Sequence, residues 1–199
     1  KALVVMPEDA SPYKKACARA YGAEVVDRGV TAENREEVAR ALQEETGYAL
    51  IHPFDDPLVI AGQGTAGLEL LAQAGRMGVF PEAVLAPVGG GGLLAGLATA
   101  VKALSPTTLL LGVEPEVADD ARRSLEAGRL FRLEAPPRTR ADGVRTLSLG
   151  EHTFPILKEK ADGILVVSEE AILEAERLLF TRTKQVVEPT GALPLAAVL

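Results

Sequence analysis

Residues 87–96 read PVGGGGLLAG, and the four consecutive glycines, Gly89 to Gly92, are the feature from which the fold can be inferred. The apolar run 83–86 before them predicts a buried strand, and residues 93–104 after them predict a helix. Glycine has no Cβ, so the backbone can turn sharply here and approach a ligand closely. The N–H groups of such a loop and of the following helix can converge on an anion. The stretch therefore predicts a phosphate-binding loop between a strand and a helix.

Other interpretations of the loop are weaker. A merely flexible turn is disfavoured because four glycines cost backbone entropy. A nucleotide P-loop would need a Lys and a Ser or Thr after its last glycine, and neither is present. Gly90, Gly92 and Ala95 match the loose dinucleotide-binding spacing. However, no acidic residue about 20 residues further on is placed to hold a ribose in the usual way. Glu114 ends an expected strand and is followed by Pro115.

Outward from the loop, short apolar runs alternate with helical patterns, which predicts an α/β fold with mostly parallel sheets. Strands expected at 3–6, 23–26 and 48–51, with helices between them, predict a small βαβαβ subdomain over residues 1–52. Residues 53–199 are expected to form a larger domain. The chain starts without Met in an apolar run and stops in another, so we expect it to be truncated at both termini.

Composition narrows the function classes. The net charge is −7 and the pI is about 5.0, which argues against a nucleic-acid partner, because phosphate contacts require a basic surface. No apolar stretch of about 18 residues is present, so no membrane span is expected. The single cysteine, Cys17, excludes an internal disulfide. These features indicate a cytoplasmic protein.

The glycine loop, followed by Leu93, resembles the tetraglycine phosphate loop of fold-type II pyridoxal-phosphate enzymes, and within them most closely the serine/threonine dehydratases and serine racemases. Four other stretches resemble that family in the right order, so that the similarity covers essentially the whole chain: 52–57, 60–65, 141–144 and 188–192. The resemblance implies a fold similar to the tryptophan synthase β chain, with a small subdomain and a larger domain.

The resemblance also implies how pyridoxal 5'-phosphate would be bound. Gly89, Gly90, Gly91, Gly92 and Leu93 would hold its phosphate, whereas Gly143 and Glu188 would lie near its ring.

The family's Schiff-base lysine belongs to an early Ser-x-Lys-x-Arg-like stretch that is not present. Lys14 and Lys15 follow Ser11-Pro12-Tyr13 and do not fit it. We therefore predict no catalytic residue in this segment, and we expect the segment alone to be inactive.

The activity implied is elimination of water and ammonia from L-threonine or L-serine, which yields a 2-oxo acid and would belong to amino-acid metabolism, including isoleucine biosynthesis. Alternatives are a serine racemase, a non-catalytic protein that binds a phosphate ligand on the same fold, and a dinucleotide-dependent oxidoreductase. The expected partners are a small amino-acid substrate and further copies of the chain, in a homodimer or homotetramer.

An acidic cluster follows the strand expected at 108–113. Glu114, Asp119 and Asp120 supply carboxylates, and a hard cation such as Mg²⁺ or Ca²⁺ prefers such oxygen ligands. The resemblance implies that the ligands are Glu114, the carbonyl of Ala118, and Asp120. The alternative is a helix start with acids in its first turn, which is common without any metal.

His52 precedes Pro53 at the end of an expected strand. It could be a general base, but a hydrogen-bonded structural role is the favoured interpretation.

Overall fold

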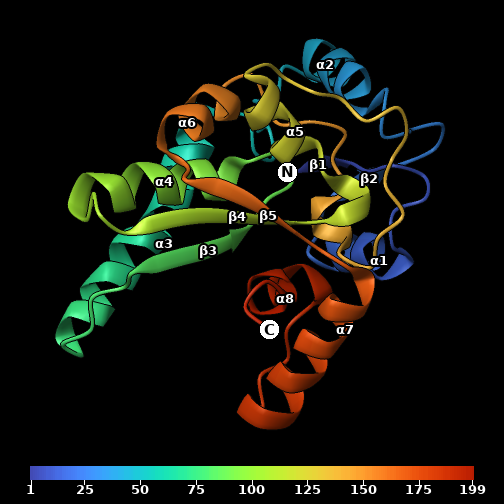
Figure 1. Cartoon of the computed structure of the whole chain (residues 1–199). Helices are drawn as coiled ribbons and strands as arrows, with labels where there is room; N and C mark the ends of the chain where they lie inside the picture. Colours follow the sequence, from blue (N-terminus) through green and yellow to red (C-terminus); the bar gives the residue numbers. More distant parts are fainter. The chain divides into compact units, whose positions relative to one another are not determined.

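A computed structural model describes all 199 residues, and contacts divide the chain into two compact units, Lys1–Ile51 and His52–Leu199 (Figure 1). The first unit contains β1 (Leu3–Val5), α1 (Pro12–Ala20), β2 (Glu24–Val26) and α2 (Arg35–Thr46). β1 and β2 pair in parallel, with Val4 opposite Val25.

The third strand predicted for this unit, at residues 48–51, is not formed. These residues are irregular and exposed, and the sheet of the first unit has two strands. A short apolar run shows β-propensity only, whereas a strand also needs a neighbour for its N–H and C=O groups. The unit is therefore β-α-β-α, and the prediction of βαβαβ was wrong.

A buried cation holds the first unit together. The Nζ of Lys15 donates to the Glu8 carbonyl at 2.8 Å and lies 2.9 Å from an Asp27 carboxylate oxygen. The hydrogen bond from Lys15 lowers the pKa of Asp27. Lys15 thus connects α1 to the loop before it and to the residue that follows β2.

The second unit is a parallel three-stranded sheet in the order β3-β4-β5 with helices on both faces. Its helices and strands are α3 (Pro57–Arg76), β3 (Ala83–Pro87), α4 (Gly92–Leu104), β4 (Leu109–Pro115), α5 (Asp120–Ala127), α6 (Thr153–Lys160), β5 (Gly163–Val167), α7 (Glu169–Leu178) and α8 (Pro189–Ala196). A π-helix, η3 (Leu179–Thr183), follows α7, and short 3₁₀ turns lie at Glu116–Ala118 (η1) and Asp142–Val144 (η2).

Successive strand residues point to opposite faces of this sheet, and each face has its own core. Val84 and Leu110 pack with α4, and Val113 and Val167 pack with α7 and α8. Figure 1 shows α4 and α8 on different sides of the strands. The predicted α/β architecture with parallel strands is confirmed.

Close packing of α3 on α4 sets the position of the glycine loop, because α4 begins at the end of that loop. A Cβ on Gly96 would overlap backbone atoms of α3, including the Ile60 carbonyl, and a Cβ on Gly64 would lie 3.1 Å from the Gly96 carbonyl oxygen. Gly64 and Gly96 therefore serve the contact between the two helices.

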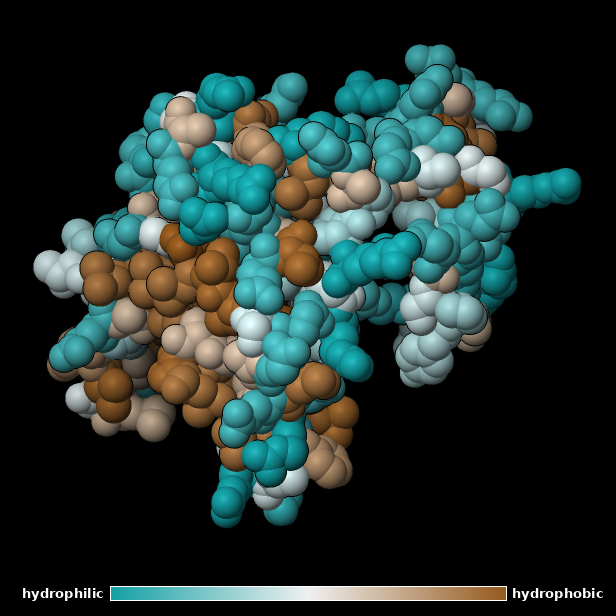
Figure 2. Space-filling model, turned by 45° about the vertical axis from the view of Figure 1, so that its right-hand side comes forward, coloured by the Kyte–Doolittle hydropathy of each residue, from teal (hydrophilic) through white to brown (hydrophobic).

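Part of the apolar surface stays uncovered. Leu109 and Leu165 on the strands are 47% and 38% exposed. Apolar residues gather in one broad area on the left of the view in Figure 2.

Among the helices, none combines the length and the apolarity that a membrane crossing requires.

Candidate functional site

The glycine loop connects β3 to α4 at the carboxyl end of the sheet's first strand. Gly91 has φ +92°, a left-handed conformation in which a side chain would be strained. Gly90, Gly91 and Gly92 are buried. The loop thus places bare backbone in the interior, directly before the start of a helix.

The other three glycines are required by their surroundings. A Cβ on Gly89 would lie 2.9 Å from the Cα of Val144, and one on Gly92 would lie 2.9 Å from the Cα of Phe54. A Cβ on Gly90 would overlap the Phe54 ring. Each position therefore excludes any larger residue unless its neighbour moves.

The amide groups of the loop have no protein acceptor. No backbone or side-chain acceptor is found for the N–H groups of Gly89, Gly90 and Gly91, and the first N–H groups of α4 lack partners because they begin a helix. A buried N–H group without a partner costs about 1–3 kcal/mol. This cluster of donors at a helix N-terminus fits the phosphate of a bound ligand.

The residues predicted to lie near the cofactor ring are linked to this loop. Gly143 lies in η2, directly before the Val144 that contacts Gly89. The Gly143 N–H donates to Thr190 Oγ1 at 3.0 Å, and Thr190 follows Glu188, the N-cap of α8, by two residues. The second unit therefore brings 141–144, the start of α8 and the glycine loop together.

The sequence motifs did not indicate the hydroxyl group of Thr146, which lies beside the loop. Thr146 Oγ1 is buried without a hydrogen-bond partner, and a Cβ on Gly89 would lie 3.3 Å from it. An unpaired buried hydroxyl next to unpaired amides is consistent with a polar ligand between them. No sequence signal marked Thr146, because it stands in an irregular stretch without a motif.

His52 has a structural role in the turn before α3. Its Nδ1 accepts from the Asp55 N–H at 2.8 Å and from the Phe54 N–H at 3.4 Å. This hydrogen bonding agrees with the favoured structural interpretation of His52.

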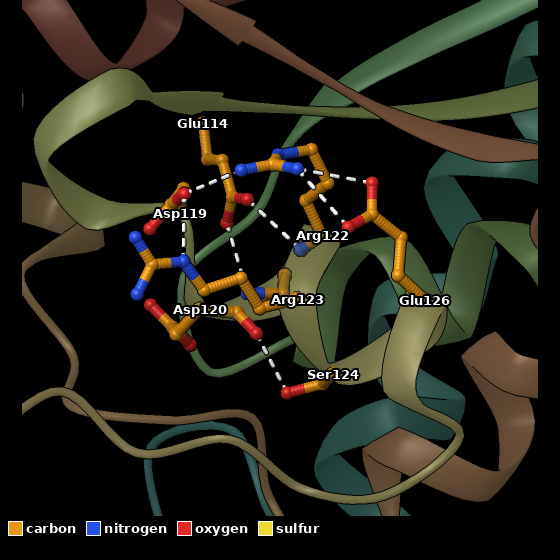
Figure 3. A network of polar contacts seen from close by, with 8 residues as sticks. Glu114, Asp119, Asp120, Arg122, Arg123, Ser124 and Glu126 are labelled. Atoms are coloured by element: carbon orange, nitrogen blue, oxygen red, sulfur yellow. Dashed lines mark hydrogen bonds and ion pairs between the residues drawn. The ribbon is translucent and has the colours of Figure 1, made fainter.

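The acidic cluster lies where β4 passes through η1 into α5 (Figure 3). The Glu114 carboxylate accepts from the Ala121 N–H at 3.1 Å and from the Arg122 N–H at 2.9 Å. Asp119 binds the guanidinium groups of Arg122 and Arg123.

Asp120 differs from its neighbours, because its Oδ2 is buried without a hydrogen-bond partner. Burial, followed by the nearby charge of Asp119, raises the pKa of Asp120 to about 7. Burial also raises the pKa of Glu114 to about 8, and the charge of Asp120 adds to this effect. The structure thus brings Glu114 and Asp120 together with Ala118, which is buried in the turn between them.

No group of three or more His, Cys, Asp or Glu side chains is arranged to hold a metal ion. The predicted set has two carboxylates and one backbone carbonyl, so it remains a prediction. The unpaired Asp120 oxygen beside a second buried carboxylate fits a hard cation.

Comparison with known proteins gives one family model, described as pyridoxal-phosphate dependent enzyme, which matches residues 1–199. An L-threo-3-hydroxyaspartate ammonia-lyase from Pseudomonas sp is 47% identical over 98% of this chain and 60% of its own length. The serine racemase of Homo sapiens is 43% identical over 100% of this chain and 57% of its own. A crystal structure of a threonine deaminase from T.th. superposes with a TM-score of 0.96 at 92% identity, covering 100% of this chain and 64% of that one. The chain therefore spans about 60% of the length of the relatives it matches.

Proposed function

The chain belongs to the family of pyridoxal-phosphate dependent enzymes, and on that premise we propose that the complete protein is an ammonia-lyase acting on L-threonine, L-serine or both. The observation that carries the proposal is the cluster of unpaired N–H groups at Gly89–Gly91, of which Gly90 and Gly91 are buried, and at the start of α4. Such a cluster supplies the anchor that a phosphate-bearing cofactor requires.

The residues of this chain would bind and orient the cofactor. The glycine loop and Leu93 would hold the phosphate by backbone N–H groups, while Gly143 and Glu188 would lie near the ring. Pyridoxal phosphate, when bound, supplies the electron sink that stabilises negative charge at the substrate's Cα. By fixing the phosphate, the loop would fix the direction in which the ring faces the substrate.

A lyase acting on threonine or serine is favoured over a racemase by the high identity, 92%, between this chain and a threonine deaminase of known structure. A serine racemase remains the second candidate, because the human enzyme matches the whole chain. A protein that binds a phosphate ligand without catalysis is the third.

The test uses the complete protein mixed with L-threonine and, separately, with L-serine. The visible absorbance of bound pyridoxal phosphate and release of 2-oxo acid and ammonia are expected. D-serine as the main product would favour the racemase. A protein that takes up pyridoxal phosphate but forms neither product would favour the non-catalytic alternative. The 199-residue segment alone is expected to form no product, and any turnover by it would contradict that expectation.

We also propose that Glu114, the Ala118 carbonyl and Asp120 hold Mg²⁺ or Ca²⁺ in a structural or activating role. The supporting observation is the buried, unpaired Asp120 Oδ2 beside Glu114. A cation present at a free concentration of a hundred times its dissociation constant would stabilise the folded state by about 2.7 kcal/mol.

Thermal unfolding of the complete protein, with and without either cation, tests the metal site. The melting temperature of the wild type should rise with the cation, and that of Asp120→Asn should not. Glu116→Gln is the matched control, since Glu116 is an exposed acid in the same turn, and it should respond like the wild type. No rise in the wild type would exclude the site.

A further inference from the structure

The Gly90 carbonyl is held from a distant part of the sequence. Its oxygen accepts from Thr153 Oγ1 at 2.7 Å and from the Gly150 N–H at 3.1 Å. Thr153 is the first residue of α6 and is fully buried. Neither contact is part of a helix or sheet ladder. Both connect the glycine loop to the turn before α6, in which the Gly150 N–H also donates to Thr153 Oγ1 at 2.9 Å.

The direction of one carbonyl determines the direction of the next amide. A peptide unit is planar, and its C=O and N–H point in opposite directions when it is trans. The chain contains no cis peptide bond. The two donors that fix the Gly90 oxygen therefore also fix the Gly91 N–H, which is one of the unpaired donors of the loop.

Thr153 is in turn positioned by Asp55. The Asp55 carboxylate accepts from the N–H groups of Glu151 and His152, each at 2.9 Å, and of Thr153 at 3.2 Å. These N–H groups belong to the first residue of α6 and to the two residues before it, a place where a negative charge is favourable. A Cβ on Gly150 would overlap the Asp55 carboxylate, so the turn before α6 closes directly over Asp55.

We propose that Asp55 and Thr153 are positioning residues that aim the Gly91 N–H at the cofactor phosphate through the Gly90 carbonyl. The inference rests on the proposed binding of pyridoxal phosphate by the glycine loop. It assigns neither residue a contact with substrate or cofactor. Their effect is on the phosphate end of the cofactor alone.

The test compares binding of pyridoxal phosphate with binding of pyridoxal, which lacks the phosphate, to the cofactor-free complete protein. Thr153→Val keeps the shape and loses the hydroxyl, and Asp55→Asn keeps the size and loses the charge. Both substitutions should weaken the binding of pyridoxal phosphate about tenfold, which is the scale of a lost hydrogen bond to a charged group. The affinity for pyridoxal should stay unchanged. The ³¹P NMR signal of the bound phosphate should shift in both variants.

Conservative and matched variants complete the experiment. Thr153→Ser retains the hydroxyl and should restore binding of pyridoxal phosphate. Asp56→Asn is the control for Asp55→Asn, because Asp56 is the adjacent acid and caps α3 instead of α6. Thr99→Val is the control for Thr153→Val, because Thr99 Oγ1 also donates to a backbone carbonyl, that of Ala95, on an exposed part of α4.

The outcomes separate the inference from the proposed function. If the wild type binds no pyridoxal phosphate, the proposed function fails. If it binds and the two variants lose both ligands equally, Asp55 and Thr153 merely stabilise the fold, and the inference is overturned. Unchanged binding of pyridoxal phosphate in either folded variant would overturn it as well.

Discussion

At the scale of single residues, the four glycines of the loop serve different purposes. Gly91 is needed for its positive φ, whereas Gly89, Gly90 and Gly92 are needed because Val144 and Phe54 occupy the space of a side chain. The four glycines thus meet two different structural requirements, a left-handed backbone at one position and space for a neighbouring residue at the other three. Only the contacts show which neighbour would resist each substitution.

Gly90→Ala should weaken pyridoxal phosphate binding in the complete protein by about tenfold or more, since the new methyl group must displace the Phe54 ring and deform the loop. Titration of the cofactor-free protein would measure this effect. The double variant Gly90→Ala/Phe54→Leu has a smaller neighbour and should recover part of the loss. Full affinity in Gly90→Ala alone would show that the Phe54 ring moves without cost.

At the scale of elements, contact between α3 and α4 depends on glycines whose backbones approach closely. Gly96→Ala should lower the free energy of unfolding by about 1–3 kcal/mol, because its methyl group would overlap backbone of α3 that cannot rotate away. Gly62→Ala is the matched control in α3, where nothing lies within 4 Å. It should stabilise by about 0.5–1 kcal/mol through helix propensity. Denaturant unfolding measures both, and equal effects would contradict the assigned contact.

An ion pair joins α4 to the sheet at Asp162, whose Oδ2 lies 2.6 Å from Lys102 Nζ and accepts from the Leu110 N–H at 2.6 Å. Burial opposes ionisation of Asp162, but the bonds from Lys102 and Leu110 prevail and lower its pKa. A lowered carboxyl pKa stabilises the fold above the ordinary value of about 3.9 and loses this effect as the pH falls through the folded value.

The free energy of unfolding of the wild type should therefore exceed that of Asp162→Asn by about 1 kcal/mol near neutral pH, and the difference should vanish in acid. Urea unfolding at a series of pH values measures this. Glu159→Gln removes an acid from an exposed pair with Lys160 and should show little difference at any pH. If the difference in free energy of unfolding between the wild type and Asp162→Asn persists in strong acid, the charge of Asp162 does not have the role assigned to it.

At the scale of the whole molecule, apolar strand residues such as Leu109 and Leu165 remain partly exposed. A broad exposed apolar area is typical of an interaction surface, including a surface between subunits. We expect the complete protein to be a homodimer or homotetramer, and its mass in solution from light scattering would measure this. A monomer at micromolar concentration would contradict the expectation.

The sequence by itself determined the features that depend on neighbouring residues. The alternation of strands and helices predicted the parallel sheet of the second unit, and the position of Gly89–Gly92 between an apolar run and a helix predicted the loop after β3. Ser168, which is followed by Glu169 and Glu170, has the side chain that a helix start favours, and it accepts from the Ala171 N–H at the start of α7. These features follow from local propensity and periodicity, which a linear pattern contains.

Only the tertiary structure decided which distant residues surround the loop. The contact of Phe54 with Gly90, the bond from Thr153 to Gly90 and the unpaired hydroxyl of Thr146 join parts of the chain that are far apart in sequence. The absence of a strand at 48–51 has the same cause, because pairing depends on a partner and not on the run itself. Long-range pairing is a property of the folded chain, so no local pattern in the sequence could reveal it.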